Sequence, residues 1–98
     1  MKVQNLVNER GNNTANQFVI TDNGNVYFQS YTTLIAKVNN NGHVTLNESY
    51  WDYSRTTSKY LYQFLRRYTA LKIDGKNDVL KYISEGKITE IPHDEFTR

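Results

Sequence analysis

The chain has 98 residues, a formal net charge of +2 and no cysteine, so it cannot form disulfides or thiolate metal sites. This length predicts one domain with one core, for which eight Tyr, four Phe and one Trp supply large side chains. The charge is too small to indicate a polyanion partner by itself. No apolar run approaches the roughly 20 residues that cross a bilayer. We therefore expect a cytoplasmic protein without membrane contact.

The first fifteen residues are polar apart from Val3, Leu6 and Val7. They can form a short strand or a helical turn, but the loop composition that follows predicts little order. We expect residues 1–15 to be disordered or peripheral.

Residues 17–47 alternate between strand and turn patterns. Asn-Gly pairs at 23–24 and 41–42 are hairpin signals. The β-branched and aromatic segments around them predict an antiparallel meander of three to four strands, at 17–21, 26–31, 34–38 and 43–47.

Beyond Tyr53 the apolar period changes to that of a helix, which we expect over residues 55–71. Ser54 or Thr56 can cap its first turn. The core-facing stripe contains Thr57, Tyr60, Leu61, Phe64, Leu65, Tyr68 and Leu71. The opposite, solvent-exposed arc contains Arg55, Lys59, Gln63, Arg66 and Arg67, with Tyr62 at its edge.

A second, shorter helix is predicted over residues 78–85, with Asn77 as its cap and Gly86 as its end. Residues 87–91 alternate and can return to the sheet as an edge strand. Residues 92–98 are expected to form a polar tail.

These elements predict an α+β fold in which the meander packs against one long and one short helix. The helix should contribute Leu61, Phe64, Leu65 and Tyr68 to the core. The sheet should face it with Phe18, Ile20, Val26, Phe28, Leu34, Ala36, Val38, Val44 and Leu46.

The first candidate binding surface is the basic arc of the long helix. Aligned cations next to a tyrosine can bind a phosphate backbone or an acidic protein surface. A solvated face that keeps a small domain soluble is the alternative. The candidate residues are Arg55, Lys59, Tyr62, Arg66 and Arg67.

The second candidate is the aromatic corner before that helix. Tyr and Trp beside Arg resemble the composition of binding hot spots. Trp51 is better explained as a cover for the end of the sheet, whereas Tyr50 and Tyr53 remain candidates for binding.

Catalytic and metal-ligating patterns are missing from the sequence. His43 and His93 are isolated, and no carboxylate pair has a spacing that indicates acid–base chemistry. We predict a non-enzyme without metal or cofactor.

The segment "WDYSRTTSKYLYQFL" (51–65), with "YFQSY" (27–31) and "LIAKV" (34–38) before it, resembles a group of small phage and prophage proteins of uncharacterised function. The resemblance covers residues 17–66 and implies a genomic context rather than a mechanism. It favours a non-catalytic accessory protein that binds a host protein, such as an inhibitor of a CRISPR effector or nuclease. A nucleic-acid-binding protein that uses the basic arc, and a module that self-associates through a strand edge, are the alternatives. The oligomeric state is left open.

Overall fold

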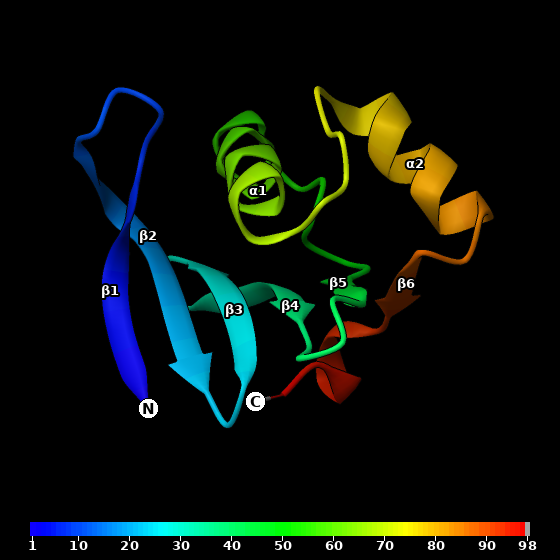
Figure 1. Cartoon of the computed structure of the whole chain (residues 1–98), viewed down its shortest axis with the longest axis horizontal. Helices are drawn as coiled ribbons and strands as arrows, with labels where there is room; N and C mark the ends of the chain where they lie inside the picture. The colour runs from blue at the N-terminus through cyan, green and yellow to red at the C-terminus, as the bar shows by residue number, and fades with distance from the viewer. Residues whose placement is uncertain (98) are drawn as a thin grey trace.

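The strands follow one another across the sheet in chain order (Figure 1). The computed structural model describes residues 1–97, which contain a six-stranded sheet of order β1-β2-β3-β4-β5-β6. The first five strands are antiparallel neighbours, and β6 pairs in parallel with β5. The strands are β1 (Lys2–Val7), β2 (Asn13–Asp22), β3 (Asn25–Ser30), β4 (Thr33–Val38), β5 (Val44–Asn47) and β6 (Ile88–Ile91).

Both helices lie on one face of this sheet, α1 (Arg55–Tyr68) over β3 and β4, and α2 (Lys76–Ser84) against β6 (Figure 1). The α+β class is confirmed. The sheet is larger than the predicted meander of three to four strands because β1 extends it at one edge. At the other edge lies β6, which corresponds to the edge strand predicted at residues 87–91. A 3-10 turn, η1 (His93–Glu95), follows β6.

The helix ends differ from the predicted ones. Helix α1 stops at Tyr68 rather than at residue 71, because Thr69 adopts extended backbone and its hydroxyl donates to Leu65 O at 2.6 Å. Helix α2 begins at Lys76 after Gly75, so Asn77 lies inside it and is not its cap. Gly86 follows its end with a φ of 77°, as the sequence predicted.

The N-terminal segment is part of the sheet, which corrects the expectation of a peripheral or disordered end. Leu6 is fully buried in the core. The pairing of β1 with β2 shifts register at this point, and Thr14 stabilises the irregularity by donating its hydroxyl to Leu6 O at 2.7 Å. A single apolar side chain therefore anchors a segment that is otherwise polar.

Both predicted Asn-Gly turns are present. Asn23 and Gly24 connect β2 to β3 with φ values of 52° and 82°, the left-handed conformation that such hairpins require. In the turn between β4 and β5, Asn39 Oδ1 accepts from the backbone N–H groups of Asn41 and His43.

The core lies between the sheet and the two helices, and the facing of β2 differs from the prediction. Val19, paired with Phe28, belongs to the core, whereas Ile20 pairs with Tyr27 outside it. Phe18 and Leu34 are also outside the core cluster. The buried members of this cluster are Leu6, Val19, Phe28, Ile35, Ala36, Val38, Val44, Leu46, Trp51, Leu61, Phe64, Leu65, Ile73, Val79 and Ile88.

The segment after β6 is not a simple polar tail. Phe96 is buried, with 6% of its surface exposed. It lines a cavity of about 480 Å³ together with Lys37 of β4, Thr45 of β5 and Thr89 of β6. These strand residues share one register row, so the C-terminal segment lies against the sheet face away from the helices (Figure 1).

Candidate binding groove beside helix α1

Ser54 fixes the start of α1. Its Oγ accepts from the backbone N–H of Thr57 at 3.1 Å, and its φ of −142° is extended. Of the two predicted caps, Ser54 is confirmed and Thr56 is not. The Thr57 hydroxyl lies 3.2 Å from that of Ser30, which connects this turn to β3.

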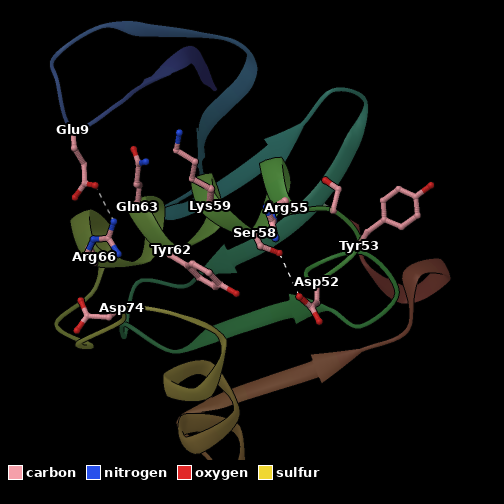
Figure 2. A pocket seen from close by; sticks show the side chains of 11 residues that line it. Glu9, Asp52, Tyr53, Arg55, Ser58, Lys59, Tyr62, Gln63, Arg66 and Asp74 are labelled. Atoms are coloured by element: carbon pink, nitrogen blue, oxygen red, sulfur yellow. Dashed lines mark hydrogen bonds and ion pairs between the residues drawn. The ribbon is translucent and has the colours of Figure 1, made fainter.

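A groove of about 570 Å³ runs along one side of α1 (Figure 2). We call it the α1 groove. Its walls come from the β1–β2 loop, the corner before α1, the helix itself and the segment before α2. The lining residues are Glu9, Asp52, Tyr53, Ser54, Arg55, Ser58, Lys59, Tyr62, Gln63, Arg66 and Asp74.

Most of the predicted binding residues lie in this groove. Arg55, Lys59, Tyr62 and Arg66 from the basic arc line it, and so does Tyr53 from the aromatic corner. Arg67 and Tyr50 are not among its lining residues.

The groove carries both signs of charge, so the basic arc is not one continuous positive strip. Arg66 donates to Glu9 Oε1 at 3.0 Å and to Ile73 O at 2.7 Å. The carboxylate of Asp52 pairs with Lys76 at 2.6 Å. Within residues 1–97, Arg55 has no ion-pair or hydrogen-bond partner for its side chain.

Lys59 also lacks a carboxylate partner among the described residues; its Nζ lies 5.3 Å from the ring centroid of Tyr60. The positive charge left unneutralised in the groove is therefore concentrated on the first two turns of the helix, at Arg55 and Lys59.

Gln63 is buried, with 7% of its surface exposed, although the helical pattern predicted an exposed side chain. The reason is the β1–β2 loop, which lies along this side of α1 and is held there by the ion pair between Glu9 and Arg66. The helical pattern predicts which side of α1 faces the sheet, but it cannot show that the β1–β2 loop covers a second side. The same loop leaves Arg66 only partly exposed.

Burial raises the pKa of the Tyr62 phenol above its ordinary value. The hydroxyl of Ser58 lies between Trp51 O at 3.2 Å and Asp52 Oδ1 at 3.4 Å. The hydrogen bond to Asp52 raises the pKa of Lys76. Tyr62, Ser58 and Asp52 thus form a polar wall of the groove that offers hydroxyl and carboxylate groups side by side.

In the aromatic corner before α1, Trp51 is buried whereas Tyr53 is exposed. Trp51 is 4% exposed and belongs to the core, so its interpretation as a cover for the sheet holds. Tyr53 is 73% exposed. Its ring centroid lies 5.5 Å from that of Tyr50, which in turn packs at 4.8 Å against His93.

A model for a family of unknown function (DUF8033) matches residues 1–81. The chain belongs to this family. All residues that line the α1 groove fall within the part matched by DUF8033, whereas β6 and the segment after it fall outside. No curated protein and no solved structure gives a significant match.

The DUF8033 model does not assign chemistry to the groove. Among residues 1–97, no group of three or more His, Cys, Asp or Glu side chains is arranged to hold a metal ion. In the same part of the chain, neither helix is long and apolar enough to cross a membrane.

Sequence reasoning missed the acidic half of the groove. Glu9, Asp52 and Asp74 are distant in sequence and come from three different connections. Their spacing in the sequence does not relate them to the cations of α1, because they come together in one groove only when the chain folds. The sole indication was the placement of Asp52 next to the helix start.

Proposed function

We propose that this member of the DUF8033 family is a non-catalytic binding protein whose α1 groove and neighbouring tyrosines dock a partner protein. The observation that carries the proposal is the mixed character of the groove. It combines cations without a carboxylate partner in residues 1–97, carboxylates of which Glu9 and Asp52 are ion-paired, and hydroxyl groups with the exposed side chain of Tyr53. Polypeptide surfaces offer complements to all of these, and interface hot spots are rich in Tyr and Arg.

The exposed tyrosines support the same proposal. Tyr31 and Tyr53 are 58% and 73% exposed, and both line a small cavity of about 210 Å³ that adjoins the helix start. Tyr53 also lines the α1 groove, so the two depressions share this side chain. Tyrosine provides a large, rigid contact area at a low cost in conformational entropy.

The resemblance of residues 17–66 to phage and prophage proteins supplies the context of the proposal. In that context the partner is a protein of the bacterial host, and the protein acts by occupying a surface rather than by chemistry. Inhibition of a defence component, such as a CRISPR effector or nuclease, is the biological role that we propose for it.

The test is capture of host proteins by the purified, immobilised chain, with and without nuclease treatment of the lysate. We expect a retained protein that survives nuclease and is lost when Arg55 and Lys59 are both changed to Glu. The Arg67→Glu variant has a charge reversal on the same helix outside the groove, and it should capture as the parent does. Retention that is equal for the parent and the double variant would contradict the proposal.

Nucleic acid is the second candidate, because Arg55 and Lys59 have no carboxylate partner and Arg67 is exposed. Phosphate neutralisation releases counterions, so the affinity for DNA should fall steeply with salt. Capture that disappears on nuclease treatment, together with a steep salt dependence, would favour this candidate over the first.

A further inference from the structure

Gln63 is the residue of the α1 groove that has, within the described part of the chain, an unsatisfied hydrogen-bond acceptor. Its Oε1 atom is buried and has no hydrogen-bond partner within residues 1–97. A buried polar atom without a partner destabilises a folded protein, so most such atoms are satisfied. A ligand that donates a hydrogen bond to this oxygen would remove the penalty.

The Gln63 amide lies where two depressions meet. Besides the α1 groove, it lines a cavity of about 300 Å³ together with Asn8, Glu9 and Arg10 of the β1–β2 loop and Lys59 and Tyr60 of α1. In Figure 2 its side chain stands between those of Glu9 and Lys59. The Gln63 side chain therefore borders a lined recess, and its terminal amide must rotate to present the buried Oε1 to a ligand there.

The cations that line this recess outnumber its carboxylates. Lys59 and Arg10 line it, and Arg55 lies one turn before Lys59 on α1. None of these three cations has a carboxylate partner among the described residues. The first turn of α1 contains no acidic residue, so the positive end of the helix dipole adds to the positive potential at Arg55.

The carboxylates of the groove do not cancel this field. Glu9 is paired with Arg66 and Asp52 with Lys76. Asp74 lies beside Arg66, at the other end of the groove from Arg55 (Figure 2). Within residues 1–97, the recess around Gln63 thus combines cations that have no carboxylate partner with an amide oxygen that has no hydrogen-bond donor.

We infer that the α1 groove binds an acidic, extended segment of the partner protein. A main-chain peptide group of that segment pairs with the Gln63 amide, donating its N–H to Oε1. Acidic side chains next to it contact Arg55 and Lys59. A phosphate backbone satisfies the cations equally but has no N–H group for Oε1, so the amide favours a polypeptide. This inference rests on the proposed function and specifies the partner's chemistry.

The test is a titration of the isotope-labelled full chain, followed by NMR, with the peptide acetyl-Glu-Gly-Glu-Gly-Glu-Gly-Glu-amide at low ionic strength. Its counterpart with Lys in place of Glu and a short inorganic polyphosphate are titrated in parallel. The side-chain amide signals of Gln63 and the backbone signals of Arg55 and Lys59 should shift with the acidic peptide. Polyphosphate should shift the signals of Arg55 and Lys59 without shifting those of the Gln63 amide, because it has no N–H group.

Gln17 supplies an internal control. Its Oε1 is also buried without a partner among residues 1–97, but it lines neither the α1 groove nor the recess. Its amide signals should stay unchanged throughout. Shifts of both glutamines would indicate a general structural change and would overturn the inference.

Charge-reversal variants give a second readout. The double change Arg55→Glu and Lys59→Glu should lower the association constant for the acidic peptide at least about tenfold, because like charges then face each other. Arg67→Glu should leave it unchanged. Equal binding of the acidic and basic peptides, or a double variant that binds as the parent does, would overturn the inference. A host protein captured through the groove while no acidic peptide binds would overturn this inference and leave the proposed function standing.

Discussion

The indole Nε1 of Trp51 donates a hydrogen bond to Oε2 of Glu90 at 2.7 Å. This contact joins the corner before α1 to β6, across 39 residues of chain. A hydrogen bond to a carboxylate contributes about 1.5–3 kcal/mol, so Trp51→Phe should lower the free energy of unfolding by at least that amount. Glu90→Gln keeps an acceptor oxygen and should cost clearly less. Urea unfolding of both variants checks this, and a loss below about 1.5 kcal/mol for Trp51→Phe would contradict the contribution of the hydrogen bond.

Phe64 is fully buried, and its ring stacks on Phe28 with a centroid distance of 5.6 Å. Phe64→Ala should destabilise the fold by about 3–5 kcal/mol, the usual cost of truncating a buried phenylalanine. Arg67→Ala, on the exposed side of the same helix, should change the free energy of unfolding by less than about 0.5 kcal/mol. Equal thermal melts for the two variants would contradict the observed facing of α1.

Ser54→Ala should cost about 1 kcal/mol, because it removes the acceptor for the N–H of Thr57 at the helix start. Thr56→Ala should be nearly neutral, since this hydroxyl has no capping role. Chemical denaturation measures both. A sensitive Thr56 and a neutral Ser54 would place the start of the helix elsewhere.

Gln63→Met should raise the free energy of unfolding by about 1 kcal/mol, because it replaces an unsatisfied buried amide with an apolar side chain of similar size. Thermal melting in the absence of any ligand checks this prediction. A lower Tm would mean that the amide is satisfied in solution, for example by a bound water. Residues kept for binding often reduce stability in this way.

Stability should fall at alkaline pH through Tyr62. Burial raises the pKa of its phenol in the folded protein, whereas the unfolded chain titrates near about 10. The folded state therefore retains a proton that the unfolded state has released, so the stability contributed below pH about 10 is lost as pH rises further. Tyr62→Phe should make the decline in stability between about pH 10 and 11 shallower. Urea unfolding across this range tests it, and identical slopes for parent and variant would refute it.

The hairpins, the long helix and its cap could be predicted because they depend on local signals. Asn-Gly turns require left-handed backbone at fixed positions, and the apolar period of α1 is unbroken. The facing of β2 could not be predicted. Residues 18–20 are all apolar, so alternation cannot show whether Val19 or its two neighbours face the helix.

The place of the N-terminal segment and the buried state of Gln63 also escaped prediction, and for the same reason. Both depend on contacts between distant parts of the chain, namely Leu6 in the core and the pair of Glu9 with Arg66. The candidate site was found in part. The basic residues of one helix are visible as a pattern, but the acidic residues that share their groove come from separate loops.

Trp51 is the single tryptophan of the chain, and the strand that supplies its hydrogen-bond partner is the last to be synthesised. The first five strands are joined by short hairpins, which close quickly because little chain entropy is lost. Pairing of β6 with β5 closes a segment that contains both helices, so it costs more loop-closure entropy than any of the hairpins and should come last. Tryptophan fluorescence during refolding would therefore record the final closing step of the sheet. Mutations in β6 should slow or reverse that late phase while the hairpins form at an unchanged rate.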